Sequence, residues 1–114
     1  MVKQGDVFWI DLDPTKGNEQ QKRRPCVVIS NNNYNVIFNT AIVAPISSSP
    51  KYLAETKYQK SPFFEPIDCQ DIHGTILLQH IRALDIYARS DLNKIGSLSQ
   101  PKLDKILSII HYEF

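Results

Sequence analysis

The chain is poor in cysteine and has no long apolar run. Its 114 residues include only Cys26 and Cys69, whereas secreted disulfide scaffolds carry more cysteines. The longest apolar stretches are short, such as residues 41–46, and a membrane-spanning helix needs about 20 such residues. The apolar segment of a secretory signal is missing after Met1. We therefore expect a cytoplasmic protein with no membrane partner and a buried free thiol at Cys26.

A metal-ligand pattern is also missing. Cys69 and His73 are four residues apart, but no second Cys or His pair follows at ligand spacing, as a structural zinc site requires. We expect no metal site and no cofactor.

An excess of charge of one sign is lacking too, because 13 basic and 12 acidic residues give a net charge of +1. Such a balance does not identify a nucleic-acid binder. The distribution is uneven, however: residues 1–60 carry a net charge of +3 and residues 61–114 carry −2. Four basic residues crowd into residues 16–24. Either a polyanion-binding face or a solvated loop accounts for this cluster.

Short strands dominate the first two thirds of the chain. Runs of β-branched, aromatic and aliphatic residues predict strands at 6–12, 26–30, 40–46, 63–67 and, as one long strand, 75–84. Pro45 indicates a strand end, an edge or a bulge. Polar composition predicts turns or loops at 13–18, 31–35, 51–62 and 68–74.

The end of the chain is predicted to be helical. Ser99 is a suitable N-cap and Pro101 fits the first turn. Apolar residues then follow at positions 103, 106, 107 and 110, on one helical face; a shorter helical turn is expected around residues 85–92. The pattern predicts an α+β protein, built as a single domain over residues 1–114 on a small, mostly antiparallel sheet or barrel.

Polar residues gather where predicted strands meet loops, in residues 11–25, 43–48 and 77–85. Arg24 is the best positioned of them, because Pro25 and a buried strand follow it directly. A guanidinium stays charged and offers a planar fork that suits a phosphate. The alternatives for Arg24 are a structural ion pair and a solvated loop arginine without a functional role.

These three segments resemble the MazF/PemK family of toxins. Residues 11–25 match the pattern D-x-D-P-T-x-G-x-E-Q-x-x-x-R-P, residues 43–47 match V-x-P-x-[TS], and residues 77–85 match L-L-x-Q-I-R-x-x-D with one change. Gly5-Asp6 and the strand bearing Trp9 match the family's opening. Order and spacing agree, and the resemblance covers nearly the whole chain.

The resemblance implies a fold and an activity. The fold is the small SH3-like β-barrel of the CcdB/MazF/PemK type with a C-terminal helix, and the protein is a homodimer. The activity is sequence-specific cleavage of single-stranded RNA to 2′,3′-cyclic phosphate and 5′-hydroxyl ends. It needs no metal, because the attacking 2′-hydroxyl is part of the substrate. The partner is a cognate antitoxin that occupies the RNA groove.

The resemblance also implies the site residues. The family's catalytic arginine and catalytic Thr or Ser fall on Arg24 and Ser47; Ser48 competes with Ser47 for the role. The residues expected to bind RNA are Lys16, Asn18, Glu19, Gln20, Lys22, Ser48 and Gln79. In residues 51–62, lysines and two tyrosines offer charge and stacking surfaces.

The general base stays open. Some members of the family carry an acidic residue at the place of Gln79 and a basic one at the place of Leu77, and His80 replaces a common Gln. Glu19 and His80 are both candidates, although strand alternation sends Gln79 and His80 to opposite faces.

The alternative function is that of a non-catalytic toxin like the gyrase poisons, or of a binding module of the same fold.

Overall fold

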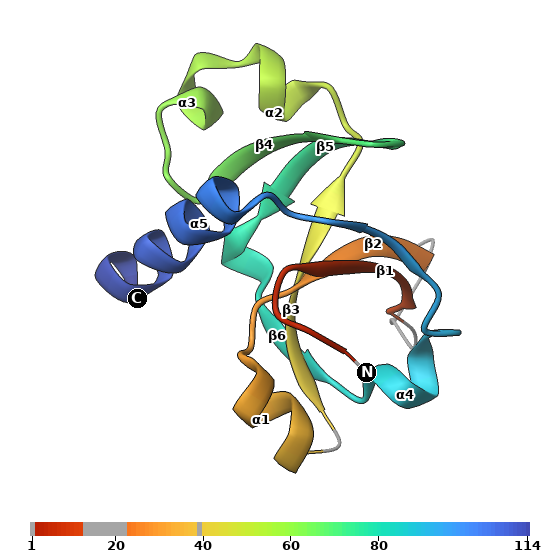
Figure 1. Ribbon diagram of the computed structural model, residues 1–114. Coiled ribbons are helices and arrows are strands. Elements are labelled where there is room, and N and C mark those ends of the chain that lie inside the picture. Colours follow the sequence, from red (N-terminus) through yellow and green to blue (C-terminus); the bar gives the residue numbers. More distant parts are fainter. Residues whose placement is uncertain (1, 13–22, 39) are drawn as a thin grey trace.

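The chain folds into a curled antiparallel sheet that carries a long C-terminal helix (Figure 1). The computed structural model describes residues 2–12, 23–38 and 40–114. In chain order its elements are β1 (Asp6–Asp11), β2 (Arg23–Val28), α1 (Asn32–Ile37), β3 (Ala41–Ser47), α2 (Lys51–Ala54), α3 (Thr56–Gln59), β4 (Phe64–Cys69), β5 (Ile72–Leu77), the 3-10 turn η1 (Leu78–His80), β6 (Arg82–Leu84), α4 (Ile86–Arg89), β7 (Lys94–Ser97) and α5 (Gln100–Glu113).

Strand β3 is the centre of the sheet. The strand order is β4-β5-β3-β2-β1-β7, and β6 pairs with β3 beside β5. Residues 41–43 of β3 pair with β6, whereas Ile46 and Ser47 pair with β5. Pro45 falls between these two segments, at a break in the ladder where a residue without an N–H is tolerated.

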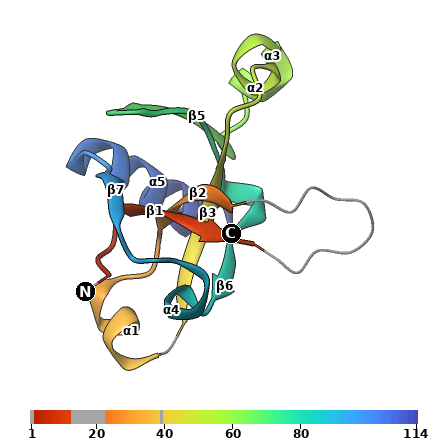
Figure 2. The ribbon, with the colours of Figure 1, turned by 90° about the vertical axis from the view of Figure 1, so that its right-hand side faces the viewer.

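The sheet bends until its two end strands meet. The Cys69 thiol at the end of β4 donates a hydrogen bond to the Ser97 carbonyl of β7, with a sulfur–oxygen distance of 3.2 Å. β7 packs so closely that a Cβ added at Gly96 would lie 3.1 Å from Ile72 Cδ1 of β5. In the view turned by 90°, α2 and α3 lie at one end of the molecule and α1 and α4 at the other (Figure 2). These contacts give the sheet its barrel form.

Two apolar clusters fill the two faces of the sheet. One joins the sheet to α5 through Leu103 and Ile106, and the other joins it to α4 through Ile86. Phe8, Ile10, Cys26, Val28 and Val43 from β1–β3 belong to the α4 cluster. Because side chains alternate along a strand, the next outward positions on the α4 face fall on Arg24 of β2 and Pro45 and Ser47 of β3.

The predicted helix and barrel are confirmed. Ser99 caps α5 by accepting a hydrogen bond from the Lys102 N–H at 3.3 Å, with Pro101 in the first turn. The predicted strands at 6–12, 26–30, 40–46 and 63–67 correspond to β1 to β4, and the helical turn around 85–92 is α4. The turn predicted at 13–18 lies outside the described residues.

Four local predictions were wrong. Residues 31–35 begin α1 rather than a loop, because the Asn31 side chain caps the helix by accepting the Tyr34 N–H at 2.9 Å. Residues 51–62 contain α2 and α3, and residues 68–74 belong largely to the β4–β5 hairpin. The long strand at 75–84 is interrupted by η1.

One strand was not predicted at all. β7 has no apolar pattern over Lys94–Ser97, and it forms because β1 offers an edge to pair with. No helix among the described residues is long and apolar enough to span a membrane.

Candidate active site

Arg24 and Ser47 lie two residues beyond the last paired residues of the neighbouring strands β2 and β3. β2 and β3 are antiparallel with Cys26 beside Pro45, and the same register carried two residues further places Arg24 beside Ser47. Both side chains then belong to the same face of the sheet. The sequence prediction that these two residues share a site is therefore consistent with the register.

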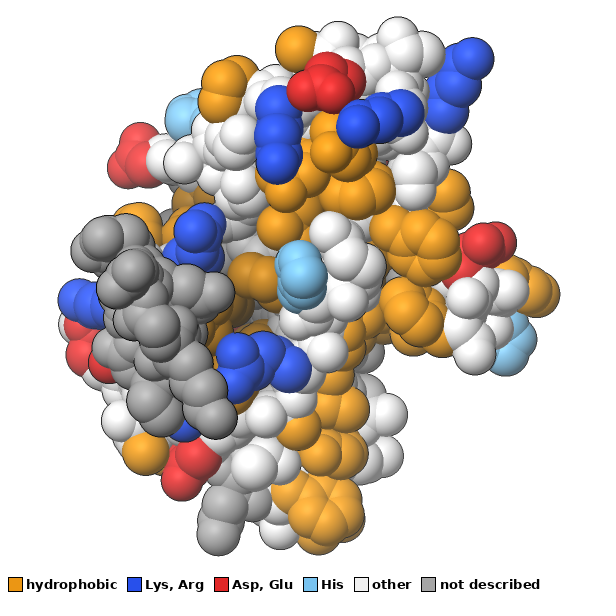
Figure 3. Space-filling model, turned by 180° about the vertical axis from the view of Figure 1, so that it is seen from behind, with side chains coloured by type: hydrophobic (Ala, Val, Ile, Leu, Met, Phe, Trp, Pro, Cys, Tyr) orange, Lys and Arg blue, Asp and Glu red, His pale blue; other side chains and the backbone are white. Residues whose placement is uncertain are grey.

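A pocket of about 360 Å³ opens at this place. We call it the Arg24–Ser47 pocket; its lining residues come from β2, β3, α2, β5, η1 and β6, with Leu12 beside β1, and are Leu12, Arg24, Pro45, Ser47, Tyr52, Leu77, His80 and Arg82. Seen from behind, Lys and Arg side chains gather around a hollow in the middle of this face, with a histidine at its edge (Figure 3). Segments far apart in the sequence thus meet at one pocket that contains two arginines.

Positive charge dominates the pocket. Arg24 and Arg82 both line it, and none of its lining residues is Asp or Glu in the part of the chain that the structure describes. Within the described residues, no carboxylate forms a salt bridge with Arg24, whereas its neighbour Arg23 pairs with Asp91 at 3.7 Å. The charge of the pocket therefore favours binding of an anion.

The thiol below the pocket takes no part in nucleophilic chemistry. Burial raises the pKa of Cys26 to about 12, and the nearby charges of Arg24 and Arg82 oppose this shift only partly. The thiolate is the nucleophilic form of cysteine, so Cys26 is an inert part of the core, as the sequence indicated.

Ser47 is held in place by its own turn. Its side chain is buried at the end of β3, with 7% of the residue exposed. The Ser47 hydroxyl oxygen accepts a hydrogen bond from the Ser49 N–H at 3.1 Å. This bond uses the oxygen as an acceptor and leaves the hydroxyl hydrogen to donate to a bound group.

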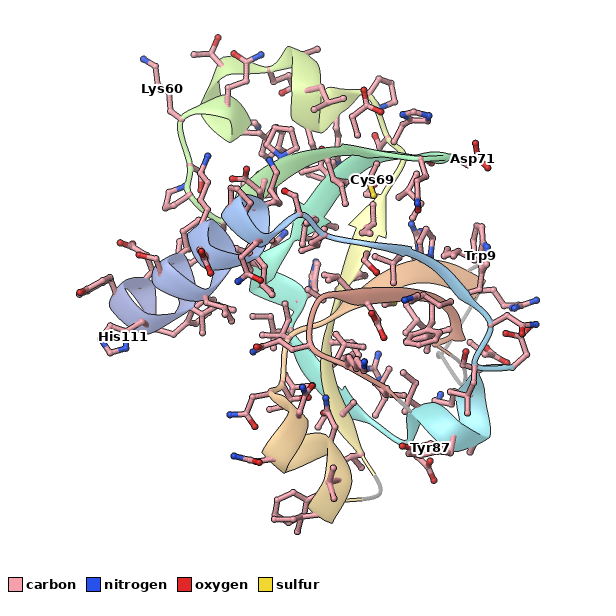
Figure 4. The ribbon with its side chains drawn as sticks, viewed as in Figure 1. Trp9, Lys60, Cys69, Asp71, Tyr87 and His111 are labelled. Carbon is pink, nitrogen blue, oxygen red and sulfur yellow. The ribbon has the colours of Figure 1, made fainter. Side chains whose placement is uncertain are left out.

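Ser48 lies in a different pocket. It is exposed and lines a neighbouring hollow of about 350 Å³ that we call the Trp9 pocket, formed by Trp9, Arg23, Arg24, Pro25, Ile46, Ser48, Asp71, Ile72 and His73. Trp9 is 41% exposed, and its side chain points toward the β4–β5 hairpin where Asp71 lies (Figure 4). Within the described part of the chain, Arg24 is the one residue that lines both pockets, so it connects them.

The remaining predicted site residues are five residues that the structure does not describe, together with Gln79. Lys16, Asn18, Glu19, Gln20 and Lys22 lie outside the described residues. Gln79 is exposed on η1 and lines neither the Arg24–Ser47 pocket nor the Trp9 pocket. Their contacts with RNA stay predictions.

Sequence reasoning missed Arg82 and undervalued His80. Arg82 pairs with Val43, so it shares a face of the sheet with Ser47. The I-R element within residues 77–85 could have indicated this arginine from the sequence. His80 was expected to be separated from Gln79 by strand alternation. The two side chains are separated, since His80 lines the Arg24–Ser47 pocket and Gln79 does not. The assumed cause was wrong, because both residues belong to η1 rather than to a strand.

Tyr52 joins the predicted stacking region to the pocket. Its ring packs on Phe64 and Tyr58 with centroid distances of 5.3 and 4.9 Å, while its side chain also lines the Arg24–Ser47 pocket. Among residues 2–12, 23–38 and 40–114, no group of three or more His, Cys, Asp or Glu could hold a metal ion.

Comparisons with known proteins identify the family of the chain. Residues 3–114 match the family of PemK-like, MazF-like toxins of type II toxin–antitoxin systems. Endoribonuclease EndoA of Bacillus subtilis (strain 168) is 36% identical over 110 residues, which cover 93% of this chain and 88% of EndoA.

Solved structures share the fold. MazF (Form-I) from Deinococcus radiodurans superposes with a TM-score of 0.71 at 23% identity, over 96% of this chain and 94% of that one. An endoribonuclease in complex with its cognate antitoxin from Mycobacterial species gives a TM-score of 0.68 at 19% identity, over 93% and 87% of the two chains. With the family match across residues 3–114, these findings show that the chain belongs to the PemK-like, MazF-like toxins of type II toxin–antitoxin systems.

Proposed function

We propose that this protein is a sequence-specific endoribonuclease toxin that cleaves single-stranded RNA in the cytoplasm, acts as a homodimer and is inhibited by a cognate antitoxin. The observation that carries the proposal is the pairing of Arg24 and Ser47 in one cationic pocket. The name of the relative EndoA, an endoribonuclease, and the antitoxin in a similar solved structure support the activity and the partner.

The pocket suits cleavage by the neighbouring 2′-hydroxyl. That reaction forms a phosphorane, whose developing negative charge a fixed cation stabilises. Arg24 supplies the cation, Arg82 adds a second, and the Ser47 hydroxyl donates a hydrogen bond to a phosphate oxygen. Because the nucleophile is already part of the RNA, the reaction needs no metal.

The metal-independent reaction has a direct test. Purified, antitoxin-free protein incubated with a long single-stranded RNA in excess EDTA should give discrete fragments with 5′-hydroxyl and 2′,3′-cyclic phosphate ends. Mapping those ends yields the recognition sequence. Intact RNA after incubation of folded protein with several RNA sequences contradicts the nuclease proposal and favours a binding or target-blocking toxin.

The two adjacent serines should differ in their effect. Ser47→Ala should lower the cleavage rate at saturating RNA by about 100-fold, because it removes a donor to the developing phosphorane charge. Ser48→Ala, the matched control, should mainly weaken RNA binding, since Ser48 lies in the Trp9 pocket. Single-turnover cleavage and circular dichroism of both variants provide the check. A larger loss of rate in Ser48→Ala than in Ser47→Ala reverses the assignment.

A further inference from the structure

His80 reaches the Arg24–Ser47 pocket because the chain turns sharply after β5. Leu78 is fully buried, and its N–H donates to the Phe63 carbonyl at 2.9 Å. The Ile81 N–H then bonds back to the Leu78 carbonyl at 3.4 Å, which closes the 3-10 turn. This anchored turn replaces strand alternation and brings His80 into the same pocket as Arg24 and Ser47.

Cleavage by a 2′-hydroxyl requires a group that accepts the hydroxyl proton. None of the other described residues that line the pocket is a suitable proton acceptor. Three have apolar side chains, and two are arginines, which keep their protons. The other two, a serine and a tyrosine, have hydroxyls that accept protons poorly near neutral pH. These lining residues are Leu12, Pro45, Leu77, Arg24, Arg82, Ser47 and Tyr52. An imidazole is the side chain that takes up and releases a proton in this range.

We propose that the His80 imidazole is the general base of the reaction; this inference depends on the RNA-cleaving function proposed above. The 2′-oxygen bonds to phosphorus, the bond from phosphorus to the 5′-oxygen breaks, and the 2′-hydroxyl proton passes to the imidazole. Water protonates the departing 5′-oxygen, and the imidazolium then releases its proton to solvent. A family member with the common Gln at this position could not use the same base, because an amide does not take up a proton.

The variant that tests the base is His80→Gln, which keeps hydrogen bonding but cannot take up a proton. His80 is exposed, so this change should not disturb folding. At saturating RNA the single-turnover cleavage rate should fall by about 100-fold or more. Binding of an uncleavable analogue with a 2′-deoxyribose at the scissile position should stay within a factor of two. His111→Gln is the matched control, since His111 is exposed at the far end of α5 (Figure 4).

The pH dependence separates a base from a positioning residue. Among the residues that the structure describes, the charged or titratable side chains that share the pocket with His80 are Arg24 on β2, Arg82 on β6 and Tyr52 on α2. The guanidiniums keep their charge. The saturated wild-type rate should therefore rise with pH, because a general base accepts a proton only in its unprotonated form. His80→Gln should abolish this rise. A second variant, His80→Ala, should regain part of its cleavage rate when imidazole is added to the solution.

The possible outcomes distinguish the two proposals. If the wild-type protein does not cleave RNA, the proposed function fails before His80 is tested. If the wild type cleaves, and His80→Gln cleaves at the same saturated rate with the same pH profile, only the assignment of the base is overturned. Weaker binding of the uncleavable analogue with an unchanged saturated rate overturns it as well, because His80 is then a binding residue.

Discussion

Arg24→Ala should abolish RNA cleavage while leaving the fold intact. Removing one preorganised group that stabilises transition-state charge lowers rates by about 100- to 1,000-fold. Arg24 is exposed near the start of β2, and no carboxylate among the described residues forms a salt bridge with it. Its loss should therefore change the free energy of unfolding by no more than about 0.5 kcal/mol. Single-turnover cleavage and urea denaturation measure the two effects.

Two further variants show whether the effect belongs to this arginine or to positive charge in general. Arg23→Ala removes the same charge one residue earlier, where the guanidinium pairs with Asp91; it should weaken RNA binding and its salt dependence but preserve the rate at saturation. Arg24→Lys keeps the charge without the planar fork, so it should recover only part of the rate. Equal losses in Arg23→Ala and Arg24→Ala contradict a catalytic role.

The parts of the site that could be predicted from sequence are those fixed by local chemistry. Pro25 holds the backbone beside Arg24, and the apolar run that ends at Ser47 predicts β3. The antiparallel register then pairs the two strands so that both residues reach one pocket. The capped helix α5 is predictable for the same reason, since Ser99 and Pro101 act within one turn.

The place of His80 could not be predicted, because it depends on tertiary packing. Residues 75–84 are apolar enough for one strand, and alternation along that strand gives the wrong face. The turn at η1 forms only because Leu78 is buried and bonds to Phe63, fifteen residues earlier. β7 is likewise formed by the edge of β1 that it meets rather than by its own sequence.

Gly74→Ala should affect stability and cleavage together. A Cβ at Gly74 of β5 would collide with the carbonyl oxygen of Ser47, would lie 3.0 Å from the carbonyl carbon of that residue, and would lie 3.4 Å from Ile46 Cγ2. The obstacle is backbone, so β3 and β5 must separate to admit the methyl group. Overpacking of this kind costs about 1–3 kcal/mol of unfolding free energy, which urea denaturation measures.

The separation should also displace Ser47, the serine proposed to act in catalysis. Ser47 pairs with Thr75, the residue after Gly74, so a shift of either strand moves its hydroxyl relative to Arg24. Displacement of about 1 Å can lower a rate by about 100-fold. Cleavage by Gly74→Ala should therefore fall far more than its folded fraction explains.

Gly96→Ala is the control that separates crowding in general from crowding at Ser47. A Cβ there would lie 2.7 Å from Gln70 Oε1 and 3.1 Å from Ile72 Cδ1, both ends of flexible side chains that can move aside. Gly96→Ala should therefore lower the free energy of unfolding less than Gly74→Ala does. It should also preserve the saturated cleavage rate, because β7 lines neither the Arg24–Ser47 pocket nor the Trp9 pocket. If Gly74→Ala cleaves at the wild-type rate once corrected for its folded fraction, the close packing of β5 on β3 supports the barrel alone, and Ser47 acts from a position that tolerates displacement.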